Sequence, residues 1–206
     1  MSGIDEQRTE PRHWLDEPRN IALLVLAQGI VFAGIGLLIW HFSGRDLDGF
    51  IRWRASDLVV ALAMGGAMIG AMQGISRAFP RFMAWAADRQ RMLFSHGRRY
   101  RPTHILILAF AAGVGEEALF RGGLQTLAGD HLPVWAAILV VSLLFTFIHL
   151  ASVGIAAFIF VISLAFGLVY HLTGSLVGVM LAHALFDVWA IAALQGELVR
   201  QGVVRA

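Results

Sequence analysis

Long runs of apolar residues, separated by short polar segments, dominate this chain. A membrane-spanning helix needs roughly 20 mostly apolar residues at about 1.5 Å of rise per residue, and six runs approach or exceed that length. They cover residues 20–42, 57–78, 104–128, 132–152, 154–172 and 175–195. The pattern predicts an all-α fold, a polytopic membrane helix bundle of about six transmembrane helices, in a single integral membrane domain over residues 1–206.

The composition supports a membrane protein and narrows its chemistry. Of the 206 residues, 58% are hydrophobic and 15% are charged, and the mean hydropathy is +0.70, values outside the range of a soluble domain. We therefore expect the lipid bilayer as a partner, whereas a net charge of +2 does not indicate nucleic acid. Without cysteine or lysine, thiolate nucleophiles, cysteine-bound metals and Schiff bases are excluded. Histidine, carboxylates and hydroxyls remain.

The arginines predict how the chain sits in the membrane, because cytoplasmic connections are enriched in positive charge. With the N-terminus inside, the outer connections hold only Arg45, Arg52 and Arg54. The first apolar run is too long for a signal-peptide core and lacks a small-residue cleavage site, so we expect a retained helix after a cytoplasmic segment at 1–19. Both termini are then cytoplasmic, in a multi-pass protein of the inner (cytoplasmic) membrane. The inner set is Arg8, Arg12, Arg19, Arg77, Arg81, Arg89, Arg91, Arg98, Arg99, Arg101, Arg200 and Arg205.

The connection at 79–103 alternates arginines with large apolar residues. This spacing predicts an amphipathic helix lying on the membrane surface. We favour an anchor on anionic headgroups over a role in gathering substrate. The apolar members are Phe82, Met83, Trp85, Ala86, Met92, Leu93 and Phe94.

Gly66, Gly70 and Gly74 recur at four-residue intervals in the second run. Such a stripe lets another backbone approach closely. We favour packing within the molecule, with an oligomer through this stripe as the alternative.

Three charged residues lie inside the third apolar run: Glu116, Glu117 and Arg121. Each costs on the order of 2.5 to 3.5 kcal/mol at membrane depth, which makes function the default explanation. On a helix, Glu117 and Arg121 are four residues apart and share a face, so an ion pair is expected, while Glu116 points elsewhere. The two carboxylates then have different surroundings, an arrangement that suits a general base beside a structural partner.

Two histidines in later runs each have a neighbour four residues away on the same helix face. His149 follows Phe145, and His183 precedes Asp187. Polar groups on three membrane helices predict a common pocket. The serines in these runs do not lie in a nucleophile elbow, and serines in membrane helices commonly bond the preceding turn, which disfavours a serine protease.

The segments EEALFR, FTFIH and HALFD resemble the EExxxR, FxxxH and HxxxN/D motifs of the CAAX protease and bacteriocin-processing family of intramembrane endopeptidases. The resemblance covers residues 104–195, a catalytic core in which all three motifs occur in order. It implies hydrolysis of a peptide bond. Glu116 and His149 would polarise a water, His183 with the residue at 187 would stabilise the oxyanion, and Glu117 and Arg121 would support them.

One position departs from the family pattern, since Asp187 stands where several members have asparagine. An ionised carboxylate accepts hydrogen bonds but cannot donate to an oxyanion, so Asp187 is either protonated or orients His183. A third interpretation is a metal site, because Glu116, His149 and His183 with Asp187 nearby form a reasonable zinc set. The absence of an HExxH-type ligand pair favours glutamic-type catalysis without a cofactor.

Other functions also fit parts of the pattern. A non-catalytic membrane protein, such as a bacteriocin-immunity factor with a vestigial site, is the main alternative. An ion-coupled carrier is less favoured, because no inverted repeat is detectable. For a protease, the lysine-free, arginine-rich composition is typical of a bacterial chain, which favours a membrane-anchored peptide or protein substrate over a prenylated one.

Overall fold

The computed structural model describes residue 14 and residues 17–91, 94, 98–149 and 152–204, and this part of the chain contains helices and no strand. The all-α fold predicted from the apolar pattern is confirmed. The helical elements in order are α1 (Pro18–Phe42), η2 (Leu47–Gly49), α2 (Ala55–Ala78), α3 (Phe82–Arg89), α4 (Pro102–Glu117), η4 (Ala118–Gln125), α5 (Thr126–Gly129), α6 (Val134–Ile148), α7 (Val153–Thr173) and α8 (Leu176–Arg200).

Within the described residues, five helical stretches are long and apolar enough to cross a membrane: Pro18–Phe42, Ala55–Ala78, Pro102–Gly129, Val153–Thr173 and Leu176–Arg200. The fourth predicted run, 132–152, is the one that differs from expectation. It forms α6, which has 15 residues and rises only about 22 Å. Pro133 delays the start of the helix and His149 already lies in its C-cap, so the apolar run is longer than the helix inside it.

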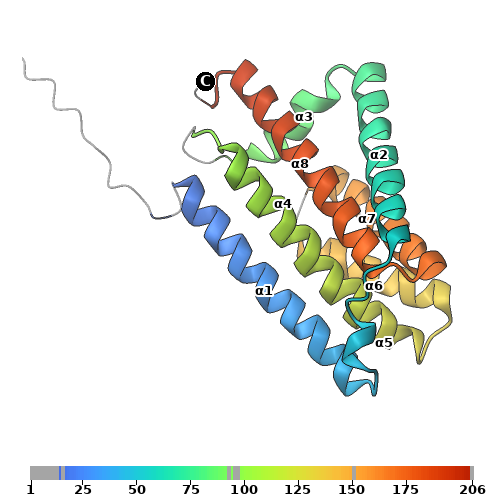
Figure 1. Cartoon of the computed structure of the whole chain (residues 1–206). Coiled ribbons are helices and arrows are strands. Elements are labelled where there is room, and N and C mark those ends of the chain that lie inside the picture. The colour runs from blue at the N-terminus through green and yellow to red at the C-terminus, as the bar shows by residue number, and fades with distance from the viewer. Residues whose placement is uncertain (1–13, 15–16, 92–93, 95–97, 150–151, 205–206) are drawn as a thin grey trace, which may run out of the picture.

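The helices pack around a central pair, α4 and α8 (Figure 1). Helix α4 lies between α1 and α8, and α8 packs on its other side against α2. Helices α6 and α7 form a second pair behind them, and α7 makes few contacts with α8. The start of α1, the start of α4, helix α3 and the end of α8 lie at one end of the bundle (Figure 1). Which side of a membrane this arginine-rich end faces stays a prediction.

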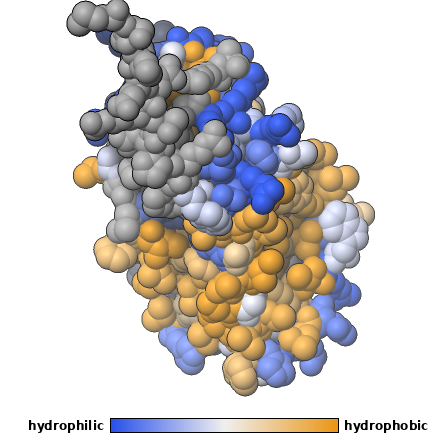
Figure 2. All heavy atoms as spheres, turned by 90° about the vertical axis from the view of Figure 1, so that its left-hand side faces the viewer, coloured by the Kyte–Doolittle hydropathy of each residue, from blue (hydrophilic) through white to orange (hydrophobic). Residues whose placement is uncertain are grey.

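The outer surface has the distribution of polarity that a bilayer requires. Figure 2 shows, on the face that includes α1, a broad hydrophobic zone with hydrophilic residues above and below it. Large apolar side chains of α1 such as Ile30, Val31 and Leu38 are exposed there. Side chains of this kind are stable at a surface that contacts lipid, and the protein is therefore a multi-pass membrane protein.

Backbone contact at glycines fixes α1 against α4. A Cβ atom at Gly29 would lie 2.4 Å from the carbonyl oxygen of Ala111, and one at Gly115 would lie 2.5 Å from Cα of Gly29. Small residues permit this close approach, which increases van der Waals contact between membrane helices. The α1–α4 contact therefore depends on having no side chain at these two positions.

The predicted role of the glycine stripe in α2 is wrong. No atom of another residue lies within 4 Å of a Cβ atom built on Gly66, Gly70 or Gly74, so the stripe points away from the bundle. The neighbouring Gly65 is the packed one, with a Cβ position 2.9 Å from the Leu185 side chain on α8. Successive residues of a helix point about 100° apart. The stripe begins one residue after the packed Gly65, and it therefore lies on the outer surface. Oligomerisation through the stripe stays a prediction.

Replacing Gly29 by alanine should destabilise the bundle. The added methyl group would overlap the Ala111 carbonyl and separate α1 from α4, at a cost of about 1–3 kcal/mol. Gly34→Ala is the matched control in the same helix, because its Cβ position has no neighbour within 4 Å. Thermal unfolding of both variants in one detergent measures the difference, and equal midpoints would contradict the α1–α4 contact.

Candidate active site

The helix that carries the two adjacent glutamates changes its winding at this point. Glu117 ends α4, and the next eight residues form the π-helical segment η4. The sequence predicted one regular helix over 104–128, so this is a local correction. The wider turn leaves the Arg121 carbonyl to accept a hydrogen bond from Thr126 Oγ1 at 2.9 Å. π-Helical turns inside α-helices occur frequently at functional sites.

The predicted ion pair between Glu117 and Arg121 is confirmed, and both side chains are almost fully buried, at 0% and 1% exposure. Arg121 Nη1 donates to Glu117 Oε1 at 3.1 Å. Arg121 Nη2 donates to both the carbonyl oxygen and Oγ of Ser163 at 2.8 Å. The guanidinium also lies over the rings of Phe145 and Phe166, at 5.0 and 5.5 Å from their centroids. The charge is thus paired, hydrogen-bonded and enclosed by aromatic rings.

Each of the two predicted histidines is oriented by a hydrogen bond at Nδ1. His149 Nδ1 lies 2.7 Å from the Phe145 carbonyl oxygen, and since a carbonyl only accepts, Nδ1 donates. His183 Nδ1 lies 2.9 Å from Glu117 Oε1, the same oxygen that accepts a hydrogen bond from Arg121 Nη1. In both imidazoles Nε2 is the nitrogen that faces the other polar groups of the site.

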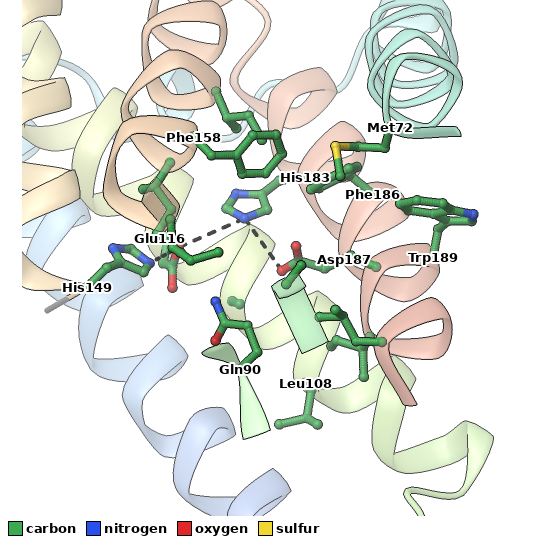
Figure 3. Close-up of a pocket in the computed structure, with 18 of the residues that line it drawn as sticks. Met72, Gln90, Leu108, Glu116, His149, Phe158, His183, Phe186, Asp187 and Trp189 are labelled. Atoms are coloured by element: carbon green, nitrogen blue, oxygen red, sulfur yellow. Dashed lines mark ion pairs between the residues drawn. The ribbon is translucent and has the colours of Figure 1, made fainter. Parts of the chain in front are cut away.

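Glu116 lies between the two available nitrogens. Its Oε2 atom is 3.9 Å from His149 Nε2 and 4.0 Å from His183 Nε2, and Asp187 Oδ2 is 3.5 Å from the same His183 nitrogen (Figure 3). These separations exceed a direct hydrogen bond, but a water about 2.8 Å from both atoms of a pair fits between them. The structure thus brings together the four side chains that the sequence singled out on three separate runs.

A cavity of about 440 Å³ gives access to these groups. Its walls are mostly apolar and come from α1, α2, α3, α4, α6, α7 and α8. The predicted surface helix at 79–103 is shorter than expected, covering 82–89, and its apolar side chains face inward: Phe82, Met83, Trp85 and Ala86 line the cavity. Helix α3 is therefore a wall of the cavity. Met92 and Leu93 lie outside the described residues.

A second buried polar contact fixes the beginning of α8. Asp57, at the start of α2, is fully buried and accepts a 2.5 Å hydrogen bond from Ser175 Oγ. Ser175 is the N-cap of α8 and accepts from the Gly178 backbone N–H at 3.1 Å. A capping residue anchored in this way ties the start of α8 to α2. His183 and Asp187 lie on the second and third turns beyond it.

The distances between the candidate donor atoms differ from those of a zinc site. A tetrahedral zinc bound at about 2.0–2.2 Å brings its ligand atoms to about 3.3–3.6 Å of one another. Glu116 Oε2 is 3.9 and 4.0 Å from the two imidazole nitrogens, wider than this. No group of three or more His, Asp or Glu side chains in the described part of the chain has the arrangement of a metal site. The residues have the chemistry of zinc ligands but are not spaced for one.

The sequence did not identify some residues that hold the site together. Ser163 holds Arg121 from α7, and its distance in the chain from the EExxxR motif, 42 residues from Arg121, gives no indication of the contact. Asp57 and Ser175 are likewise 118 residues apart. Polar residues in apolar runs were the available signal, but they did not identify their partners.

The fold and the site define a membrane-embedded helix bundle with a buried glutamate and two histidines facing a largely apolar cavity. Residues 99–189 match the protein family described as type II CAAX prenyl endopeptidase Rce1-like, and this segment contains the two adjacent glutamates, Arg121, both histidines and Asp187. This is the family that the three motifs in the sequence resemble. Members of that family are described as endopeptidases, which are hydrolases.

A relative of the whole chain is the "Uncharacterized protein YpbD" of Bacillus subtilis. It is 28% identical over 176 residues, which are 84% of this chain and 88% of that protein. The similarity therefore extends beyond the three motifs and covers nearly the full length of both proteins. No solved structure matches this chain.

Removing the Arg121 guanidinium should strongly destabilise the protein. In Arg121→Ala the Glu117 carboxylate would be left buried without its counter-charge, which costs about 3–5 kcal/mol. Arg200→Ala is the control. Arg200 is paired with Glu197, three residues earlier in the same helix, but it is mostly exposed, so we expect a loss of stability of only about 0–1 kcal/mol. Unfolding curves in detergent measure both. Equal losses would contradict a special role for the buried pair.

Proposed function

We propose that the protein is a glutamic-type intramembrane endopeptidase. It cleaves a peptide bond in a membrane-anchored peptide or protein, in the cytoplasmic membrane. The observation that carries this proposal is the position of Glu116 Oε2, about equally distant from the Nε2 atoms of His149 and His183 inside a cavity. The family match supports the same reaction class.

In the first step, Glu116 and His149 activate a water molecule. The water lies between Glu116 Oε2 and His149 Nε2, which accept its two hydrogens. Its oxygen lone pairs then face the substrate. As the oxygen bonds to the carbonyl carbon, Glu116 takes one proton as the general base. The mostly apolar walls of the cavity strengthen this interaction, because they lower the local dielectric constant.

In the same step, His183 stabilises the oxyanion that forms on the carbonyl oxygen. Carboxylates lie beside both of its nitrogens, Glu117 at Nδ1 and Asp187 at Nε2, and the ring acts in its doubly protonated form, in which each nitrogen donates. The Nε2–H of this ring donates to the oxyanion. Asp187 then orients His183 and stabilises its positive charge, a role that an ionised carboxylate can perform.

The intermediate collapses when the proton on Glu116 moves to the leaving nitrogen. The carbon–nitrogen bond breaks, the carbonyl re-forms, and the products are a carboxylic acid and an amine. Glu116 is ionised again and ready for the next water. Glu117 and Arg121 take no proton in this cycle, and they hold His183 in position through the 2.9 Å contact at Nδ1.

Glu116→Gln should abolish cleavage. The amide cannot take the proton from water, so we expect the rate to fall by on the order of 10² or more. The test compares the membrane proteins of cells that express wild-type or Glu116→Gln protein at equal levels and looks for a species that accumulates uncut. Purified wild-type protein should then cut that species, and His149→Ala should not.

Glu197→Gln is the matched control, since Glu197 lies near the end of α8 and is not a cavity residue. It should retain activity. If the biological activity of the chain survives in Glu116→Gln at normal expression, the protein is not a protease and the non-catalytic alternative holds.

Metal removal should leave the activity unchanged. We propose that the reaction uses no metal, because the site residues are too widely spaced around Glu116 to share one ion. Purified protein should contain far less than one zinc per chain by elemental analysis, and cleavage should persist after dialysis against a chelator. Stoichiometric zinc, together with activity that is lost on chelation and restored by zinc, would contradict the proposal.

A further inference from the structure

One polar side chain in the cavity has no role in the reaction described above. Gln90 follows α3 directly, is half-buried and lines the same cavity as Glu116 and Asp187. Figure 3 shows it across from His183, with its carboxamide on the cavity side. Among the residues that the structure describes, this carboxamide has no hydrogen-bond partner.

The position of Gln90 is fixed by a packed element. Its backbone N–H donates to the Ala86 carbonyl at 3.0 Å, which continues the last turn of α3. Ala86 and Ala87 are buried, and α3 packs against α8, the helix that carries His183 and Asp187. The backbone of Gln90 therefore has a defined place beside the cavity, from which its carboxamide reaches the side of the catalytic groups.

A substrate in this cavity needs polar partners for its backbone. The peptide bond to be cut must leave its helix or strand so that water can reach the carbonyl carbon, and the neighbouring N–H and C=O groups then lose their hydrogen bonds. In a mostly apolar cavity, such unpaired groups oppose binding. A carboxamide carries a donor and an acceptor side by side, as a peptide bond does, and can pair with both.

We propose that Gln90 is a substrate-binding residue that recognises the peptide backbone beside the scissile bond. Its Nε2 donates to a substrate carbonyl, and its Oε1 accepts from a substrate N–H. This inference rests on the proposed protease function. Because Gln90 contacts backbone, it selects an unwound peptide segment and not a particular side chain.

The first test separates binding from chemistry. The probe is a synthetic peptide that spans the cut site of the species accumulating in Glu116→Gln cells, assayed with purified protein in liposomes. Gln90→Leu keeps the size of the side chain and removes its hydrogen bonds, so KM should rise about 10-fold while kcat stays within about twofold. Gln28→Leu is the matched control, since Gln28 lies on α1, is exposed and does not line the cavity. It should behave as wild type.

The second test asks which backbone group Gln90 binds. One amide of the peptide at a time is replaced by an ester, which removes the N–H and weakens the carbonyl as an acceptor. With wild-type protein, the ester at the recognised position should raise KM several-fold more than esters elsewhere. With Gln90→Leu, that position should lose its special effect, because the partner is already absent. Gln90→Ala repeats the comparison if the leucine variant folds poorly.

The outcomes distinguish this inference from the one it rests on. If wild-type protein cleaves no membrane species, the protease function fails and the role of Gln90 fails with it. If wild type cleaves and Gln90→Leu has an unchanged KM, only the role of Gln90 is overturned. It is also overturned if Gln90→Leu lowers kcat and shows the same ester profile as wild type, since a merely structural role predicts that result.

Discussion

The buried ion pair between Glu117 and Arg121 is the interaction on which the site depends. It connects the end of α4 with η4, reaches α7 through Ser163, and reaches α8 through His183. Charges at this depth are stable only when paired and hydrogen-bonded, so the four elements must keep their positions for the pair to persist. The same carboxylate oxygen that accepts from Arg121 contacts His183 Nδ1. One contact thus serves both the fold and the orientation of the His183 imidazole.

The helices around the ion pair are held by contacts of different kinds. On one side, α1 and α4 meet backbone to backbone at Gly29 and Gly115, where a methyl group would not fit. On the other side, the buried hydrogen bond between Asp57 and Ser175 fixes the start of α8 on α2. Neither contact touches the reacting groups. Both determine where Glu116 and His183 stand, since these residues belong to α4 and α8, and a rigid helix transmits its position along its length.

The cavity determines what surrounds the site and how it is reached. Helix α3 closes one side with apolar residues, and the Trp85 ring lies against Gly154 at the beginning of α7. Helix α7 packs mainly on α6 and makes few contacts with α8. A peptide held in such a cavity meets apolar walls, the catalytic groups and the Gln90 carboxamide. These surroundings fit the proposed substrate, a segment of a membrane-anchored chain whose backbone hydrogen bonds have been broken.

The sequence by itself determined the features that local geometry fixes. Apolar run lengths indicated the membrane helices, and four-residue spacing paired Glu117 with Arg121 and His183 with Asp187, because a helix places such residues on one face whatever surrounds it. Only the tertiary structure decided which way each helix faces and which distant residues meet. The orientation of α2 moved the glycine stripe outward, α3 turned Gln90 into the cavity, and α7 supplied Ser163 to Arg121. Such features depend on residues that are far apart in the chain. Their free energies depend on how the helices pack, which the spacing of residues along the chain does not encode.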